Sequence, residues 1–282
     1  MMTQENFLIR TIVNESEVNL MLSWAAFEGW NPGKYDSQTF YYTDPKGFFI
    51  GELNDQPIGC ISAIAYDLTF GFLGFYIVQS EFRNQGFGIQ LWQKAMEYLG
   101  NRNIGLDGVI AQQKNYEKSG FKIAYNHIRY QGIGGGKISD KLIDLNRISW
   151  EELITYDRQC FPTNRQGFLH NWIQQKETIA LGFINNHKLQ GYGVIRPAEN
   201  GYRIGALFAD NFEVADIIYQ GLIADKKDLP VFIDIPSSNL LAQQLVKKYA
   251  MYPVFEAARM YNKNFPDIAI NKIFGVTSLE LG

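Results

Sequence analysis

The chain contains little of what marks secreted, metal-binding or membrane-spanning proteins. Its 2 cysteines, Cys60 and Cys160, stand far apart, with no Cys-x-x-Cys pair or neighbouring His cluster. This spacing argues against a disulfide framework or a zinc site and fits a reducing compartment. No apolar run reaches the roughly 18 residues that a spanning helix needs, and residues 1–6 lack the basic and apolar regions of a signal peptide. We therefore expect a cytoplasmic protein with no bound metal and no membrane partner.

A strong excess of one charge is also absent. The formal net charge is −3, the sequence pI is about 5.7, and no dense run of Lys and Arg occurs. Non-specific electrostatic binding of nucleic acid is therefore not expected. Hydrophobic residues make up 46% and charged residues 20%, which is typical of a globular chain. A length of 282 residues is enough for two domains of ordinary size.

The most informative stretch runs from residue 72 to residue 121. It opens with the apolar run 72–78, which predicts a strand buried on both faces. A glycine-bearing turn follows, made of Arg83, Asn84, Gln85, Gly86, Phe87 and Gly88. Apolar residues then recur at helical spacing, at Ile89, Leu91, Trp92, Ala95, Met96 and Leu99. The predicted order is strand, turn, helix.

A turn of this kind can bind an anion. The first turn of a helix leaves amide N–H groups without partners and carries the positive end of the helix dipole. Gly86 and Gly88 remove Cβ atoms that would keep a phosphate away, and Arg83 adds positive charge. A pyrophosphate would fit. The alternative is a tight turn with no ligand, since neither a Walker loop nor a full Gly-x-Gly-x-x-Gly pattern is present.

A second motif lies further along the chain. The turn reads Arg83-x-x-Gly86-x-Gly88, and Tyr116-x-x-x-Gly120-Phe121 comes after it. In this order and spacing the two motifs resemble the GNAT superfamily of N-acetyltransferases. The resemblance implies an enzyme that uses acetyl-CoA as cosubstrate. It also implies that the backbone amides of residues 84–88 hold the CoA pyrophosphate.

The same resemblance implies catalytic roles. Ile77 and Val78 match strand positions whose backbone pairs with the pantetheine arm, and an amide near Val78 would stabilise the oxyanion. Tyr116 matches the tyrosine that protonates the leaving thiolate; the alternative is a tyrosine packed under the sheet. The family's usual Asn and Ala before this tyrosine are Gly108 and Gln112 here. That departure leaves open how the pantetheine end is held.

Candidate acceptor contacts lie in the loop 28–33 and near residue 67. In GNAT enzymes the connection after the first helix borders the acceptor pocket, which points to Glu28, Trp30 and Asn31. The alternative is that Trp30 fills the core and Glu28 is solvated. Asp67 stands between two apolar runs, where it could face the acceptor or simply cap a turn. The strand 72–78 carries no carboxylate, so no strand-borne general base can be assigned. A water chain to Glu28 or Asp67, or an amine that arrives neutral, remains open.

The chain reads as two similar halves. In the first we expect strands at 7–13, 48–53, 57–66, 72–78, 106–110 and 121–130, and helices at 15–28, 37–42, 89–99 and 112–119. The strand 121–130 is expected to close the first sheet, and the glycine-rich 131–136 to be a flexible linker. In the second we expect strands at 179–184, 189–195, 202–209, 231–235 and 253–261, and helices at 150–157, 213–224 and 238–249.

This order predicts an α/β (α+β) fold of two tandem GNAT-like units, 1–136 and 137–282, each a mixed, mostly antiparallel sheet flanked by helices. The tandem order, the loop 28–33 and the ending 273–282 resemble a GNAT subgroup with a YitH-like C-terminal acetyltransferase domain. In place of the anion loop the second half has 210–216, with three carboxylates and no glycine. These would repel a pyrophosphate, so we expect this unit to have lost CoA binding.

These observations lead to one main hypothesis. The protein is expected to transfer acetyl from acetyl-CoA directly to a primary amine, with a small molecule favoured over a protein as acceptor. The second unit would wall the acceptor cleft and take the place of a dimer partner, which predicts a monomer. The alternatives are a non-catalytic module that binds CoA or acetyl-CoA, an acetyltransferase acting on protein amines, and transfer of a longer acyl chain.

Overall fold

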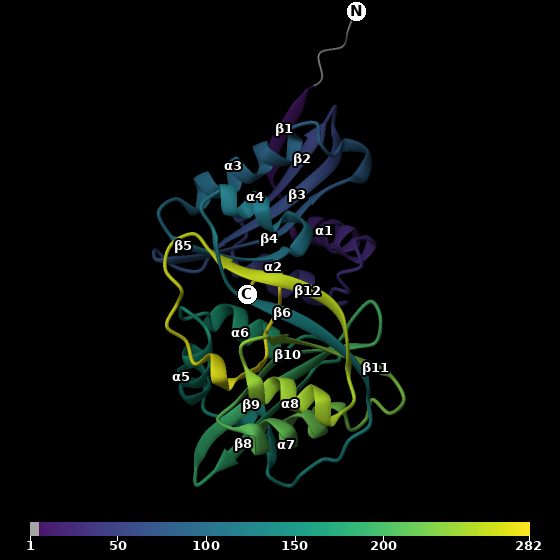
Figure 1. The fold of residues 1–282 in the computed structure, drawn as a ribbon, viewed down its shortest axis with the longest axis vertical. Helices are drawn as coiled ribbons and strands as arrows, with labels where there is room; N and C mark the ends of the chain where they lie inside the picture. Colours follow the sequence, from purple (N-terminus) through teal and green to yellow (C-terminus); the bar gives the residue numbers. More distant parts are fainter. Residues whose placement is uncertain (1–5) are drawn as a thin grey trace, which may run out of the picture.

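The computed structural model describes residues 6–282, so most of the segment used to judge a signal peptide lies outside the described residues. The first half contains β1 (Phe7–Thr11), α1 (Glu15–Phe27), α2 (Asp36–Thr43), β2 (Phe48–Leu53), β3 (Gln56–Ala65), β4 (Phe70–Val78), α3 (Phe87–Leu99), β5 (Asn103–Val109), α4 (Gln113–Lys118) and β6 (Lys122–Ile133). The second contains β7 (Leu142–Asp144), α5 (Trp150–Cys160), α6 (Gln166–Ile173), β8 (Ile179–Asn185), β9 (Lys188–Pro197), β10 (Tyr202–Ala209), α7 (Phe212–Ile223), β11 (Pro230–Pro236), α8 (Leu240–Lys248), β12 (Tyr252–Tyr261) and β13 (Ile273–Gly275). The predicted tandem, mixed α/β organisation is confirmed (Figure 1).

The strands of both halves form one 13-stranded sheet in the order β1-β2-β3-β4-β5-β12-β6-β11-β10-β9-β8-β7, with β13 paired to β10. Pairing is antiparallel except between β4 and β5 and between β10 and β11. Figure 1 shows β6 and β12 crossing the middle of the elongated molecule, with α3 and α4 in its upper half and α7 and α8 in its lower half. The sheet therefore runs through both units without a break.

The last strands of the two units are exchanged. The prediction that 121–130 closes the first sheet is wrong, because β6 pairs with β12 and β11 and not with β5. β12 takes the place beside β5, with Ala258 opposite Gly108. An alternating apolar pattern specifies which face of a strand is buried but not which strand lies beside it, so the sequence could not reveal the exchange.

The glycine-rich segment after β6 is held in place. Gly134 N donates to Leu229 O at 2.8 Å and Gly135 N donates to Ile223 O at 2.9 Å. The predicted flexible linker is thus hydrogen-bonded to the second unit. The boundary placed after residue 136 stays a prediction, since the exchanged strands leave no simple border in the sheet.

The predicted helices are all present, and the structure adds α6, which was not predicted. The side chain of Asn14 caps α1 by accepting from Ser16 N at 3.0 Å, and the inward residues Val18, Met21, Leu22 and Ala25 are buried. In α3 the stripe is less complete than predicted: Leu91, Trp92, Ala95 and Leu99 are buried, whereas Ile89 is 52% exposed. Ile89 lies in the first turn, at the edge of the cavity described below.

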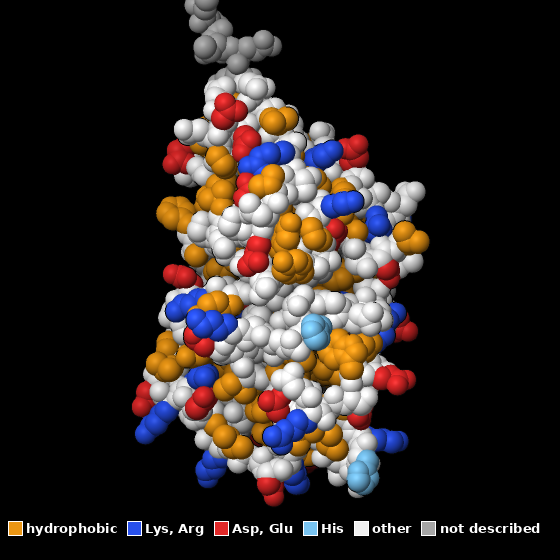
Figure 2. All heavy atoms as spheres, turned by 180° about the vertical axis from the view of Figure 1, so that it is seen from behind, with side chains coloured by type: hydrophobic (Ala, Val, Ile, Leu, Met, Phe, Trp, Pro, Cys, Tyr) orange, Lys and Arg blue, Asp and Glu red, His pale blue; other side chains and the backbone are white. Residues whose placement is uncertain are grey.

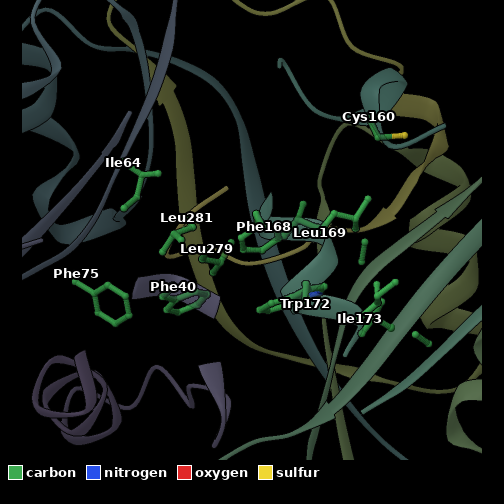
Figure 3. Close-up of a cluster of buried hydrophobic side chains, with 14 of the residues drawn as sticks. Phe40, Ile64, Phe75, Cys160, Phe168, Leu169, Trp172, Ile173, Leu279 and Leu281 are labelled. Atoms are coloured by element: carbon green, nitrogen blue, oxygen red, sulfur yellow. The ribbon is translucent and has the colours of Figure 1, made fainter. Parts of the chain in front are cut away.

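A hydrophobic cluster joins the two units around the end of the chain. Leu279 and Leu281 lie between side chains of both halves (Figure 3). The residues drawn there from the first half are Phe40, Ile64 and Phe75, and those from the second include Phe168, Leu169, Trp172 and Ile173. Next to this cluster Arg196 Nε donates to Asp36 Oδ1 at 2.8 Å, and both side chains are almost fully buried. The units are thus fused by a shared core.

The surface carries both signs of charge. On the face seen in Figure 2, Lys and Arg side chains are interspersed with Asp and Glu, and apolar side chains lie between them. None of the helices in the described part of the chain is long and apolar enough to cross a membrane.

Candidate active site

A cavity of about 480 Å³ opens where β4 and β5 part. These strands pair in parallel only from Phe70 to Leu73. The pairing of β3 with β4 shifts register between Cys60 and Ser62, and at this bulge Phe75 takes a positive φ of 46°. The bulge turns the end of β4 away from β5. Residues beyond the divergence, Gly74 to Val78, therefore line one wall of the cavity.

Antiparallel pairing decides which backbone groups of β4 face the cavity. Gln79 N donates to Ile58 O at 2.9 Å. Because hydrogen-bonded pairs alternate along such a ladder, Ile77, opposite Cys60, also turns its backbone groups toward β3. Val78 turns its groups away from β3, and its carbonyl accepts from Arg83 Nε at 2.8 Å. Of the two predicted backbone contacts, Val78 is the one with its amide on the open side.

The anion loop lies at one end of the cavity. Gly86 is the N-cap of α3 with a φ of 88°, and Asn84 also has a positive φ, of 61°. No side chain within residues 6–282 caps this helix, so its first amides keep their hydrogen-bonding capacity for an anion. A Cβ on Gly88 would lie 2.8 Å from Tyr76 Oη. Glycine is therefore needed at the two positions for different reasons. Gly86 allows the left-handed turn, and Gly88 allows close packing on Tyr76.

Two predicted loop residues shape the turn rather than line the cavity. Gln85 Nε2 donates to Glu81 O at 2.8 Å. Phe87 is buried, with its ring centroid 4.7 Å from that of Phe7. Asn84, Gly86 and Gly88 do line the cavity.

Arg83 and Glu28 lie at the cavity and form an ion pair with each other. The sequence suggested separate roles, Arg83 for the cofactor and Glu28 for the acceptor. In the structure each charge is already partly neutralised by the other, and both side chains are partly exposed. The attraction of Arg83 for a phosphate is correspondingly reduced.

Tyr116 is buried on α4 and lines the cavity, with its ring centroid 5.5 Å from Trp92. Burial, reinforced by the nearby Tyr76, raises the pKa of the Tyr116 phenol above its ordinary value. A Cβ on Gly108 would lie 2.3 Å from the Tyr116 ring. Gly108 thus makes room for this tyrosine. Gln112, the other position that departs from the family pattern, also lines the cavity.

The predicted acceptor residues are only partly brought together. Trp30 lines the cavity, but Asn31 does not. The Asn31 side chain instead bonds to the backbone of Asn200 in the second unit, at 2.7 and 3.0 Å. This contact ties the loop after α1 to the second half.

Asp67 also lies outside the cavity lining. Its carboxylate accepts from Thr69 N and Phe70 N and from the Thr163 hydroxyl of the second unit. The residue is exposed; partial desolvation of its carboxylate opposes ionisation, but these donors hold the pKa of Asp67 at about 2. Asp67 therefore occupies the turn-capping position that was the alternative reading.

Sequence reasoning missed several residues that line the cavity, namely Asp107, Arg129, Phe255 and Glu280. Phe255 comes from the exchanged strand β12, and Glu280 from the end of the second unit. The only sequence signal for Glu280 is a carboxylate between two leucines in an otherwise uncharged ending. No local pattern could have placed it beside β4.

The buried charged groups that line the cavity belong to two hydrogen-bonded networks. In one, Asp107 accepts from Arg259 Nη2 at 2.6 Å and lies 2.9 Å from His127 Nδ1. Burial alone would raise the pKa of Asp107, but Arg259 and His127 lower it.

In the other network Asp234 accepts from Arg129 at 2.7 Å and from Arg203 at 2.8 Å. Arg203 also donates to Glu280 Oε1 at 3.2 Å. Burial opposes ionisation of Asp234, but the two guanidinium groups hold its pKa below the usual range.

The corresponding helix of the second unit is built differently. The side chain of Asn211 caps α7 by accepting from Val214 N at 3.0 Å, and Glu213 lies in the first turn. A helix start with its own cap and a nearby carboxylate is unfavourable for a phosphate. Loss of CoA binding in this unit stays a prediction.

Comparison with known proteins places both halves in one family. The acetyltransferase (GNAT) family profile matches residues 16–121, and an acetyltransferase (GNAT) domain profile matches residues 153–275. Holothin acyltransferase from a Pseudoalteromonas species is 31% identical over 269 residues, which are 94% of this chain and 92% of that protein.

Two solved structures have a similar fold across both units. A provisionally assigned acetyltransferase from Pyrococcus horikoshii aligns with a TM-score of 0.83 at 21% identity, covering 98% of this chain and 96% of its own. A tandem GNAT protein from the clavulanic acid biosynthesis pathway aligns with a TM-score of 0.63 at 9% identity, covering 92% and 98%. With two family domains in one chain and an acyltransferase relative along nearly its full length, the protein belongs to the GNAT family as a tandem acyltransferase.

Proposed function

We propose that the protein transfers the acetyl group of acetyl-CoA directly to the primary amine of a small molecule. The observation that carries this proposal is the cavity between the parted strands β4 and β5. The uncapped start of α3 lies at the cavity, as do the buried Tyr116 and an inner wall closed by the second unit. These features together suit an elongated, anionic thioester.

The residues present fit acetyl-CoA, which supplies an activated acyl thioester. The amides of residues 84–88 would hold the pyrophosphate at the α3 N-terminus. The Val78 amide, which faces away from β3, would contact the pantetheine arm and stabilise charge on the thioester oxygen. Ile77 would line the cavity beside the pantetheine arm without bonding to it through its backbone, since its backbone groups turn toward β3.

Tyr116 is suited to give a proton to the departing thiolate. A phenol of ordinary pKa is already protonated at neutral pH, and Tyr116, whose pKa is raised by burial, stays so; it lines the cavity alongside Val78. As the thiolate forms, the proton moves from Tyr116 Oη to the sulfur. Solvent reprotonates the phenol after release.

The inner wall supports a small acceptor. Trp30, Phe75 and Phe255 supply apolar surface there, and the second unit contributes residues to the same wall. This enclosure leaves less room for a protein side chain presented on a folded surface. The relative at 31% identity is named for acylating holothin, which supports acyl transfer by this architecture. The shared core also supports a monomer, with the second unit in place of a dimer partner.

Isothermal titration with acetyl-CoA tests the cofactor site. We expect micromolar binding by the wild type and at least about a tenfold loss in Gly86→Asp, whose carboxylate would enter the anion loop. Gly120→Asp is the matched control: residue 120 has the same φ of 88° and open space around it, but it does not line the cavity. Absence of binding to the wild type, or equal loss in both variants, would contradict the proposed site.

A further inference from the structure

Glu280 lies at the inner wall of the cavity although it belongs to the end of the second unit. It is only 3% exposed. Its backbone passes directly against β4, since a Cβ on Gly74 would lie 1.9 Å from Glu280 O. The glycine at residue 74 therefore lets this segment approach the strand that borders the cavity.

The carboxylate of Glu280 is only half satisfied. Oε1 accepts from Arg203 Nη1 at 3.2 Å. Oε2 is buried and has no hydrogen-bond partner, and no other carboxylate oxygen in residues 6–282 shares that condition. A buried acceptor without a partner is unfavourable, and native structures rarely keep one without a reason. A ligand that donates a hydrogen bond would satisfy it.

The carboxylate is also held in a fixed position. Ser278 Oγ accepts from Glu280 N at 3.2 Å and from Leu281 N at 2.9 Å. On either side, Leu279 and Leu281 are anchored in the cluster between the units (Figure 3). Arg203 is itself fixed, because it also donates to Asn31 O at 3.1 Å and to Asp234.

The other charged groups at the cavity are already engaged. Glu28 is paired with Arg83, Asp107 with Arg259, and Arg129 with Asp234. Among the residues that line the cavity, Glu280 Oε2 is thus the buried carboxylate oxygen without a hydrogen-bond partner. Apolar side chains line the same cavity, among them Phe75, Phe255 and Leu279.

We propose that Glu280 binds the acceptor amine and acts as its general base, and that the acceptor is a primary amine with a compact apolar body. This inference rests on the proposed function. The neutral amine would donate one N–H to Oε2, and as its nitrogen bonds to the acyl carbon and the C–S bond breaks, that proton moves to Oε2. The thiolate takes its proton from Tyr116. Glu280 then releases its proton to solvent and Tyr116 takes one from solvent, so that both side chains regain their starting states.

The test compares two probes that differ only in the donor group, 2-phenylethylamine and 2-phenylethanol. Their affinities are measured by titration calorimetry in the presence of CoA. We expect the wild type to bind the amine at least about tenfold more tightly than the alcohol. Glu280→Gln should lose this preference while binding acetyl-CoA as the wild type does. With the amine as acceptor, its kcat should fall by about a hundredfold or more.

Glu151→Gln, an exposed residue in the first turn of α5, is the matched control and should keep the wild-type preference. Equal affinity of the wild type for the two probes, or an unchanged preference in Glu280→Gln, would overturn the assignment. The first of these outcomes needs no variant, so the proposal stays testable if Glu280→Gln does not fold. Failure of the proposed function is seen separately, as absence of acetyl-CoA binding to the wild type.

Discussion

The ring of Tyr116 occupies the space that a side chain at residue 108 would need. A Cβ on Gly108 would lie 2.3 Å from Cε2 and 2.7 Å from Cδ2 of that ring. Gly108 is on β5 and Tyr116 on α4, so the glycine determines how closely the helix can bring the phenol to the cavity. The departure from the family pattern at residue 108 has a steric reason.

Gly108→Ala should therefore displace Tyr116. Overpacking of this kind costs about 1–3 kcal/mol of stability, and we expect acyl transfer to fall by at least about tenfold. Gly167→Ala is the control, because residue 167 lies in α6 with open space around it and alanine is there favoured by up to about 1 kcal/mol. Urea unfolding and thiol-release kinetics measure the two effects. A fully active Gly108→Ala enzyme would contradict the stated role of the glycine.

Tyr116→Phe separates an enzyme from a protein that only binds the cofactor. The substitution keeps the ring packed on Trp92 and removes only the hydroxyl. We expect kcat to fall by about 10² to 10⁴, with the Kd for acetyl-CoA unchanged. Steady-state kinetics and titration calorimetry provide the two values. Unchanged turnover would remove Tyr116 from the proposed mechanism.

Glu28→Gln should increase the affinity for acetyl-CoA. Glu28 neutralises part of the charge of Arg83, and partly exposed ion pairs contribute up to about 1 kcal/mol. Release of Arg83 should therefore tighten binding by up to about fivefold, less at high salt. Arg83→Gln and the double variant complete the cycle, and in the absence of Arg83 the change at Glu28 should have no effect. Weaker binding by Glu28→Gln would indicate a direct role for this carboxylate.

Arg196→Met should destabilise the junction between the units. It leaves Asp36 buried without its charge partner, a change that typically costs about 3–5 kcal/mol. The double variant with Asp36→Asn should recover much of this loss, since asparagine can still accept the bond from Gly33 N. Denaturant midpoints of the four proteins test the expectation. Equal destabilisation in the single and double variants would show that the loss of stability comes mainly from the lost packing of Arg196 on Trp172.

Acid stability should depend on Asp67. Its pKa in the folded protein is about 2, below the ordinary 3.8, so its carboxylate form stabilises the fold above about pH 4. That stability is lost as the pH falls toward 2. Because Asp67 is exposed, we expect about 1 kcal/mol rather than the full value of the shift. The difference in unfolding free energy between the wild type and Asp67→Asn should shrink over this range, whereas Asp55→Asn, in an exposed turn, should show no such trend.

Most of the fold could be predicted because local signals agree with it. The cap at Asn14, the turn at Asn54 and Asp55 with positive φ, and the apolar stripe of α3 are all written in short stretches of sequence. The position of the anion loop at the start of α3 follows from the same kind of signal. Of the predicted site residues near β4, α3 and α4, all but Gln85 and Phe87 meet at one cavity.

What could not be predicted depends on long-range pairing. The placing of β12 beside β5 and the passage of Glu280 along β4 bring together residues far apart in the chain, without a local pattern. The same is true of the bonds that engage Asn31 and Asp67 with the second unit. For these polar residues the sequence showed that they were unusual but not which partner satisfied them.

The exchange of β6 and β12 affects how the specificity of such an enzyme can evolve. The loop proposed for the cofactor lies wholly in the first half, whereas the wall proposed for the acceptor is completed by Phe255 and Glu280 of the second. Substitutions at the end of the chain could therefore alter the choice of amine while the CoA loop stays the same. Deletion of the second half would remove both the strand beside β5 and the proposed base. On this proposal the second unit, even without CoA binding of its own, would be retained because the first unit depends on its strand and its wall residues.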